Sequence, residues 1–222
     1  MSGPRIKICG LTRVEDADLA VALGADAVGF VLWSPSPRVV SADDAATIAR
    51  SLPPFVTRVG VFVNASPEAV GRLVAEIGLD VVQLHGDERV ADYAGVARRL
   101  VKVVALSGEA DVDSAMRLPL DVTVLVDAVD RERRGGTGAR ADWARAARVA
   151  RERPVILAGG LSAADVGEAI GRVRPWAIDV SSGVEDRPGI KSAEKLRALF
   201  AAVAAADATS RRPAGSAGQE DA

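Results

Sequence analysis

The sequence predicts an α/β protein built as a single-domain (β/α)8 TIM barrel, with a doubly wound sheet as the alternative architecture. Eight short runs rich in Val, Ile and Leu recur along the chain, and a helical pattern follows each of them. No Gly-x-Gly-x-x-Gly follows the first run, and strands that end in glycine cluster late in the chain. These observations favour the barrel.

The eight runs read as buried parallel strands because they are nearly continuous, rich in β-branched residues and bounded by Gly, Pro or polar residues. Any one of them could instead belong to a buried helix, but a series of eight is hard to explain in that way. The runs are Ile6–Cys9, Ala27–Val31, Val59–Phe62, Val81–Leu84, Val101–Val104, Val122–Asp127, Val155–Ala158 and Ala177–Val180.

The segments between the runs carry apolar residues at a spacing of three to four, which predicts helices. Ser41, Ser66 and Ser162 are candidate N-caps, and Gly24 and Gly78 follow two helix ends, where glycine suits a left-handed cap. The predicted helices are Glu15–Leu23, Asp43–Leu52, Pro67–Ile77, Val90–Leu100, Asp142–Arg151, Ala163–Val173 and Ser192–Ala206, with a weaker one at Ser107–Arg117.

Two of the strand–helix units are longer than the rest, and each carries its extra residues directly after its strand. From one strand end to the next they span 31 residues, whereas the other units span 20 to 23. The extra length lies at residues 33–38 and 128–140. In a (β/α)8 barrel the loops that follow the strands form the catalytic face, so we expect function to concentrate there.

Composition excludes several classes of protein. The 222 residues include 28 basic and 30 acidic side chains, so charge gives no reason to expect a nucleic acid or a membrane surface as a partner. A single cysteine and a single histidine exclude an internal disulfide and a His/Cys zinc cluster. No apolar run approaches the roughly 18 residues of a membrane span, and the first residues lack a signal-peptide core. We therefore expect a cytoplasmic protein with a barrel over residues 1–206 and a disordered C-terminal tail over residues 207–222.

Cys9 and Asp127 are the candidate acid–base pair. Each closes a predicted strand, the first and the sixth, and these two strands lie on opposite sides of a barrel mouth. A small buried thiol and a loop-capping carboxylate are the alternative roles of the two residues. An acid and a base that flank one substrate suit an isomerisation by proton transfer.

Arg38 and His85 are candidate binding residues. Arg38 ends the long second loop, where it could present its guanidinium to a substrate carboxylate, although it could also be a plain surface arginine. His85 follows the fourth strand and could assist a proton transfer or have a structural role.

Glycine-bearing loops after the seventh and eighth strands predict a phosphate site. Gly159 and Gly160 follow one strand, and Ser182 and Gly183 follow the other. Glycine lets backbone amides approach an anion closely, and these two loops are where such barrels commonly bind phosphate, although either loop alone could be a tight turn. Gly135–Gly138 could form a flexible lid over the site or a loose loop.

From Lys7 to about Leu199 the chain resembles the phosphoribosylanthranilate isomerase family of tryptophan biosynthesis. The resemblance rests on many motifs in order: Lys7–Thr12, Gly24–Phe30, Ser36–Arg38, Val59–Asn64, Val82–Gly86, Leu125–Asp127, Gly135–Gly138, Gly159–Leu161, Asp179–Glu185 and Pro188–Gly189.

The resemblance implies an Amadori rearrangement of N-(5-phosphoribosyl)anthranilate. It makes Asp127 the general acid that opens the ribose ring and Cys9 the general base that takes the C2′ proton. It also implies that Arg38 binds the anthranilate carboxylate and that the late glycine loops hold the phosphate. The implied partner is one phosphorylated small molecule, and the rearrangement requires no cofactor and no metal.

Some features depart from the family pattern, and other functions stay open. Ala139 and Arg140 stand where the family usually has a basic residue and then a hydroxyl residue, and Ser192 stands where it often has Asp. ProFAR isomerase of histidine synthesis, or a barrel that serves both pathways, is one alternative, but that family has an Asp at the position of Cys9. A non-catalytic phosphosugar-binding regulator is another. The sequence is compatible with a monomer or a homodimer.

Overall fold

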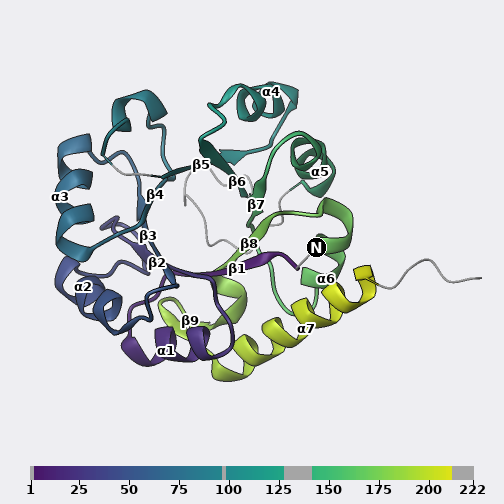
Figure 1. Ribbon diagram of the computed structural model, residues 1–222, viewed down its shortest axis with the longest axis horizontal. Coiled ribbons are helices and arrows are strands. Elements are labelled where there is room, and N and C mark those ends of the chain that lie inside the picture. Colours follow the sequence, from purple (N-terminus) through teal and green to yellow (C-terminus); the bar gives the residue numbers. More distant parts are fainter. Residues whose placement is uncertain (1–2, 97–98, 128–141, 212–222) are drawn as a thin grey trace, which may run out of the picture.

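The computed structural model, which describes residues 3–96, 99–127 and 142–211, is a closed barrel of eight parallel strands (Figure 1). Each strand pairs with the next, and β1 pairs with β8 to close the ring. The strands are β1 Arg5–Cys9, β2 Ala27–Val31, β3 Thr57–Phe62, β4 Val81–Leu84, β5 Leu100–Ala105, β6 Val122–Asp127, β7 Val155–Leu157 and β8 Ala177–Val180. The predicted (β/α)8 fold is confirmed.

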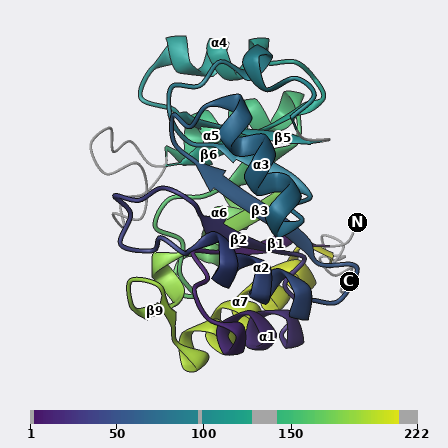
Figure 2. The same ribbon diagram turned by 90° about the vertical axis from the view of Figure 1, so that its left-hand side faces the viewer.

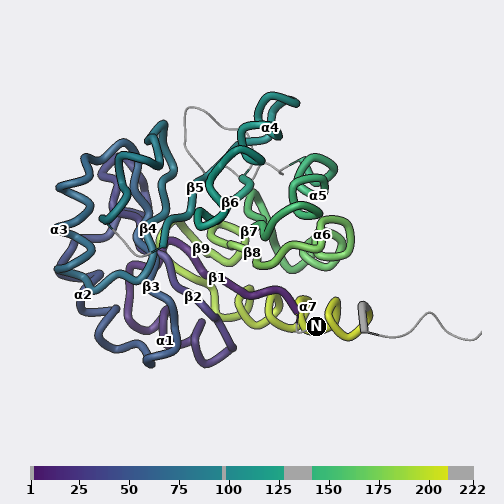
Figure 3. The backbone as a smooth tube through the Cα atoms, turned by 45° about the horizontal axis from the view of Figure 1, so that its top comes forward, coloured from purple at the N-terminus to yellow at the C-terminus, as the bar shows by residue number. Residues whose placement is uncertain are grey.

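The helices surround the strands on the outside of the barrel (Figure 3). Leu and Val side chains from the outward faces of the strands and the inward faces of the helices form the larger hydrophobic core. The helices are α1 Val14–Ala22, α2 Ala42–Ser51, α3 Pro67–Ile77, α4 Glu109–Arg117, α5 Trp143–Glu152, α6 Val166–Val173 and α7 Ala193–Arg211. Among the described residues, no helix is both long enough and apolar enough to cross a membrane.

Several predicted helix boundaries agree with the caps in the structure. Ser41 and Ser66 accept hydrogen bonds from backbone N–H groups in the first turns of α2 and α3. Gly78 ends α3 with a φ of 75°, a left-handed conformation that glycine adopts without strain. Ser162 is not the cap of α6, because Asp165 precedes the first residue of that helix and its carboxylate accepts the N–H of Ser162.

The prediction of a helix over Val90–Leu100 is wrong. Among the described residues of this segment, 90–96 and 99–100, only Val90–Tyr93 are helical, as the short 3-10 helix η1, and β5 already begins at Leu100. Gly95 lies two residues after η1 with a φ of 88°, which right-handed helix does not allow. The Tyr93 hydroxyl donates a hydrogen bond to the carbonyl of Ala65, so tertiary contacts fix this turn in place.

The predicted tail and the predicted lid fall wholly or partly outside the described residues. α7 continues past the expected boundary at residue 206 and ends at Arg211, so residues 207–211 are helical. The rest of the expected tail, residues 212–222, lies outside the described chain. So does the segment 128–141, which includes the Gly135–Gly138 loop and Arg140.

A small antiparallel hairpin after β8 is not predicted by the sequence. It consists of β9 Glu185–Arg187 and β10 Ile190–Lys191, with η2 Ser182–Val184 before it. In Figure 2, β9 and the loop that follows β2 extend from the same end of the barrel. The two segments approach closely, because a Cβ on Gly189 would lie 3.8 Å from the carbonyl oxygen of Pro37.

The interior of the barrel changes character along its axis. One layer is apolar and consists of Val59, Val81, Val101, Leu125, Ile156, Ala158 and Ala177. Because alternate residues of a strand face the same side, the next inward positions toward the carboxyl ends can be read from this layer. On β4, β6 and β8 these positions hold Gln83, Asp127 and Asp179. The barrel interior is therefore filled by apolar side chains in this layer and becomes polar toward the carboxyl ends of the strands, where barrels of this kind have their catalytic face.

Candidate active site

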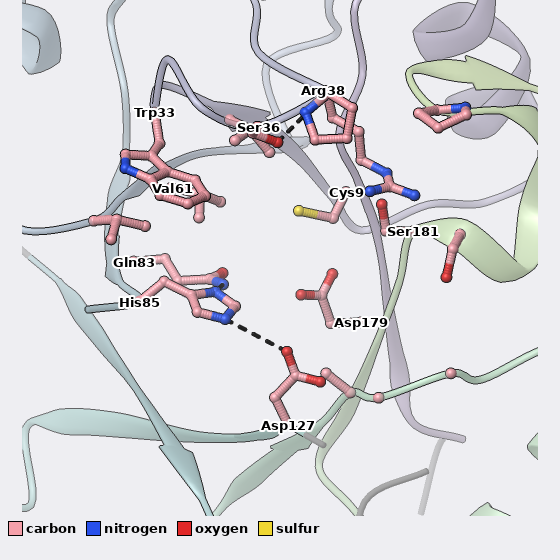
Figure 4. Close-up of a pocket in the computed structure, with 18 of the residues that line it drawn as sticks. Cys9, Trp33, Ser36, Arg38, Val61, Gln83, His85, Asp127, Asp179 and Ser181 are labelled. Atoms are coloured by element: carbon pink, nitrogen blue, oxygen red, sulfur yellow. Dashed lines mark hydrogen bonds and ion pairs between the residues drawn. The ribbon is translucent and has the colours of Figure 1, made fainter. Parts of the chain in front are cut away.

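A cavity of about 520 Å³ opens at the carboxyl ends of the strands and brings most of the predicted site residues together (Figure 4). Seven of the eight predicted residues line it: Cys9, Arg38, His85, Asp127, Gly159, Gly160 and Ser182. Gly183, the eighth, lies in η2 beside the cavity. Side chains from the loop after β2, including Trp33, line the other side. A cavity of this size accommodates a small organic ligand.

Cys9 and Asp127 enter the cavity from different strands. Cys9 is the last residue of β1 and Asp127 is the last residue of β6, and the two residues are 8% and 9% exposed. Figure 4 shows the Cys9 sulfur and the Asp127 carboxyl pointing into the same space from different sides. Burial raises the pKa of the Cys9 thiol above its ordinary value, although the ammonium of Lys7 opposes this rise.

His85 lies beside Asp127 rather than beside Cys9. Its Nε2 is 3.5 Å from Oδ2 of Asp127, and its Nδ1 is 3.4 Å from the side-chain nitrogen of Gln83. Because that amide nitrogen is a donor, this contact favours the tautomer with its proton on Nε2, which faces the carboxylate. The imidazole thus holds Asp127 from the side and lines the cavity.

The guanidinium of Arg38 is already engaged by a carboxylate of the protein. Its Nε and Nη2 donate to Glu185 of the β9–β10 hairpin at 3.0 and 2.7 Å, and both side chains are buried. The Ser36 hydroxyl accepts the backbone N–H of Arg38 at 3.1 Å, which fixes the loop after β2. Arg38 is therefore a buried, oriented cation at the edge of the cavity and not a surface arginine.

Glu185 also binds a second buried cation. Nζ of Lys191 donates to Oε1 of Glu185 at 2.8 Å and to the carbonyl oxygen of Cys9 at 2.6 Å. Burial would raise the pKa of Glu185, but hydrogen bonds from Arg38 and the charge of Lys191 outweigh it and hold that pKa below its ordinary value. Two side chains of the hairpin thus link Cys9 to Arg38: Lys191 binds the carbonyl oxygen of Cys9 and Glu185, and Glu185 binds Arg38.

The two glycine loops pack against each other at the wall of the cavity. Gly159 and Gly160 have φ angles of 89° and 63°, a region that side chains rarely adopt. A Cβ on Gly183 would lie 1.9 Å from the carbonyl oxygen of Leu161, so the loop after β8 touches the loop after β7 at backbone distance. Together they form a concave stretch of backbone that can approach an anion closely.

Several polar side chains at the base of the cavity were not predicted as site residues from the sequence. Lys7 lies deeper in the barrel, whereas Gln83, Asp179 and Ser181 line the cavity. Oδ1 of Asp179 and Oγ of Ser181 are buried and have no hydrogen-bond partner among the described residues. Buried polar atoms are usually satisfied, so these two suit a ligand rich in hydroxyl groups. The missed signal is the two-residue period of the strands, which places Lys7 with Cys9 on the inward face of β1 and Asp179 with Ser181 on the inward side of β8 and its end.

Comparisons with known proteins agree on one family. A family model for N-(5'phosphoribosyl)anthranilate (PRA) isomerase matches residues 6–202. The N-(5'-phosphoribosyl)anthranilate isomerase of Pseudomonas putida (strain W619) is 46% identical over 205 residues, which cover 91% of this chain and 98% of that protein.

Solved structures are similar over the same length. The crystal structure of phosphoribosyl anthranilate isomerase from Thermus thermophilus has a TM-score of 0.82 and 44% identity, covering 90% of this chain and 98% of that one. Another phosphoribosyl anthranilate isomerase was solved in complex with reduced 1-(o-carboxyphenylamino)-1-deoxyribulose 5-phosphate. It has a TM-score of 0.81 and 38% identity, covering 91% of this chain and 99% of that one.

Proposed function

The chain belongs to the N-(5'-phosphoribosyl)anthranilate isomerase family, and on that premise we propose that Cys9 and Asp127 catalyse an Amadori rearrangement of N-(5-phosphoribosyl)anthranilate. The protein is thus an isomerase of tryptophan biosynthesis, and the proposal concerns how its residues do the chemistry. The observation that carries the proposal is the placement of one thiol and one carboxyl group at the ends of β1 and β6, facing one cavity.

Asp127 acts first, as the general acid. Its carboxylic acid gives a proton to the ribose ring oxygen while the bond from that oxygen to C1′ breaks and the amine nitrogen forms a double bond to C1′. The product of this step is a protonated Schiff base, and Asp127 is left as a carboxylate. His85 Nε2, 3.5 Å from Oδ2 of Asp127, steadies the carboxyl group in both forms.

Cys9 acts second, as the general base. Its thiolate removes the proton from C2′, the electron pair of that bond forms the C1′–C2′ double bond, and the iminium becomes an enolamine. Tautomerisation of the enolamine gives the ketone at C2′, so C1′ is reduced and C2′ is oxidised within one molecule. Atoms and electrons balance without an external oxidant or reductant, and no cofactor enters the scheme.

The ends of the substrate bind on opposite sides of the cavity. Nε and Nη2 of Arg38 donate to Glu185, so Nη1 is the nitrogen that donates to the anthranilate carboxylate. The phosphate is held by backbone at Gly159–Gly160 and at Ser182–Gly183, where the two loops meet. The sugar then lies between Cys9 and Asp127.

The test is an isomerase assay on phosphoribosylanthranilate generated in situ, with ProFAR as the comparison substrate. We expect turnover of the first and not of the second. Cys9→Ala and Asp127→Asn should each lower kcat by about 10²–10⁴-fold, the usual effect of a general acid or base. Asp113→Asn, on the exposed face of α4, is the matched control and should leave kcat unchanged.

Binding measurements separate catalysis from a purely regulatory barrel. Reduced 1-(o-carboxyphenylamino)-1-deoxyribulose 5-phosphate should bind the Cys9→Ala and Asp127→Asn variants about as tightly as the parent chain. Tight binding by the parent without turnover would favour the non-catalytic alternative. Near-normal turnover in either variant would remove the proposed role of that residue.

We also propose that the chain works in the cytoplasm as a monomer or a homodimer. Cell fractionation tests the location, and sedimentation equilibrium at several protein concentrations tests the assembly. A membrane-bound or larger species would contradict this part of the proposal.

A further inference from the structure

A lysine ammonium lies inside the barrel, directly beneath the proposed base. Lys7 precedes Cys9 by two residues on β1, so both side chains point inward. The Lys7 side chain is 6% exposed, and its Nζ donates to Oδ2 of Asp179 at 2.8 Å and to Oε1 of Gln83 at 3.0 Å. A lysine is rarely buried to this extent, because removing its charge from water is costly.

Gly29 brings the ammonium-bearing side chain and the thiol to the same place. In the register of β1 and β2, Gly29 is opposite Cys9. A Cβ on Gly29 would lie 2.7 Å from Sγ of Cys9 and 3.1 Å from Cε of Lys7. Both side chains therefore occupy the space above one glycine, which leaves the charged end of Lys7 beside the thiol.

The charges around the thiol act in opposite directions. Burial is the largest influence on the pKa of Cys9 and raises it, whereas the charge and hydrogen bond of Lys7 lower it. Asp179 on β8 raises that pKa and Lys191 on β10 lowers it. Among the residues that the structure describes, the other ionisable groups that face the cavity are Arg38 after β2, His85 after β4 and Asp127 on β6.

The ammonium of Lys7 carries three protons, and hydrogen bonds to two side chains fix its position. Two are donated to Asp179 and Gln83, and the positive charge acts on the neighbouring sulfur of Cys9. Burial would lower the pKa of Lys7, but Asp179 and Cys9 outweigh it and raise that pKa, so Lys7 stays charged. It is therefore a fixed cation and not a proton carrier.

We propose that Lys7 is a positioning residue that stabilises the thiolate of Cys9, and that Asp179 limits this effect by sharing the ammonium. The inference rests on the proposed function, in which Cys9 is the base. When the thiolate takes the C2′ proton, the new S–H bond removes the negative charge, and Lys7 keeps its three protons and its contact with Asp179.

The single cysteine makes a direct test possible. The rate of Cys9 alkylation by iodoacetamide is measured without substrate from pH 6 to pH 10.5, with the adduct quantified by intact mass. The rates are fitted to a single titration, and its midpoint, or the lower bound of the midpoint where no plateau is reached by pH 10.5, gives the thiolate fraction independently of access to the cavity. Each unit of change in the thiol pKa changes this fraction tenfold on the acid side.

Two variants should move the profile in opposite directions. Lys7→Met should lower the thiolate fraction at pH 7.5 by tenfold or more, and Lys7→Arg should restore most of it. Asp179→Asn should raise the fraction several-fold, because a negative charge is removed and the ammonium turns toward sulfur. Lys102→Met is the control: this lysine is 13% exposed and pairs with Glu88, and its profile should match the parent.

The outcomes decide between an electrostatic and a structural role. An unchanged profile in folded Lys7→Met, or a shift of the same sign in Lys7→Met and Asp179→Asn, would overturn the inference. If Lys7→Met does not fold, the opposite shift expected in Asp179→Asn still decides. The alkylation assay contains no substrate, so it does not depend on isomerase activity. If the profiles shift as expected but the chain has no isomerase activity, the effect of Lys7 on the Cys9 thiol stands and only the proposed function is rejected.

Discussion

Replacing Arg153 with methionine should destabilise the barrel while leaving its chemistry intact. Arg153 is buried at the end of α5, and its guanidinium donates four hydrogen bonds to backbone carbonyls between α4 and β6. The acceptors are Ala115 at 2.9 Å, Leu118 at 2.8 Å, Pro119 at 2.9 Å and Val122 at 2.6 Å. The Arg153 side chain therefore holds the end of α4, the loop that follows it and the start of β6 together.

The magnitude follows from which carbonyls can find water after the substitution. Leu118 and Pro119 lie in a connection that is partly open to solvent, whereas Ala115 and Val122 are 0% and 3% exposed. Leaving two buried acceptors unpaired costs about 1–3 kcal/mol each. Arg153 is buried, and burial lowers its pKa because it disfavours the charged guanidinium, so removal of this group offsets part of the cost. We expect a net loss of about 2–4 kcal/mol in the free energy of unfolding.

Urea unfolding at pH 7, followed by tryptophan fluorescence and circular dichroism, measures the loss. In a chain of this length it corresponds to a fall in Tm of about 4–16 °C. Arg151→Met, at an exposed position on the same helix, is the control and should change the unfolding free energy by less than about 0.5 kcal/mol.

Activity provides the second half of this prediction. Val122 begins β6 and Asp127 ends it, so the hydrogen bonds of Arg153 and the candidate active site lie at opposite ends of the strand. At 20 °C the Arg153→Met variant should keep the kcat of the parent. A loss of unfolding free energy below about 1 kcal/mol would show that water replaces the guanidinium at all four carbonyls, and would refute the reasoning.

Three other perturbations have defined outcomes. Gly183→Ala should raise KM at least tenfold with a smaller change in kcat. The new Cβ would lie 1.9 Å from the carbonyl oxygen of Leu161 and would push the two proposed phosphate loops apart. An unchanged KM in steady-state kinetics would contradict this. Glu185 has a depressed pKa in the folded state, so its contribution to stability is present at neutral pH and is lost as the pH falls through that value. The urea midpoint of Glu185→Gln should therefore depend less on pH between 6 and 3 than that of the parent, and parallel curves would refute the assignment. Gly78→Ala should cost about 1 kcal/mol in urea unfolding, from the left-handed backbone alone, since the nearest atom to the new Cβ is Arg58 Nη1 at 3.7 Å; no change would mean that the cap relaxes.

The strands were predictable because their signal is local. Buried parallel strands need continuous apolar runs, and the turns between them need caps, so both features are written in short stretches of sequence. Val90–Leu100 shows the limit of this reading. Its apolar spacing suits a helix, but Gly95 and the contact of Tyr93 with Ala65 favour a turn instead.

The site was predictable where function coincides with a strand end. Cys9, Asp127 and His85 come directly at or after a strand, so topology alone places them at one mouth. The partner of Arg38 was not predictable, because Glu185 is 147 residues away and belongs to a hairpin without a strand signal. No local pattern specifies such a pair.

The pairs that span almost the whole chain have a consequence for the order in which the site is made. Lys7 meets Asp179 across 172 residues, and Lys191 meets the carbonyl of Cys9 across 182. A growing chain that still lacks β8 and the hairpin has only β2 to pair with the strand of its thiol, and it lacks Asp179 and Lys191 of the closed barrel. Contacts of such long range form late in folding. The contacts of Lys7 with Asp179 and of Cys9 with Lys191 can therefore form only after almost the whole chain has been synthesised.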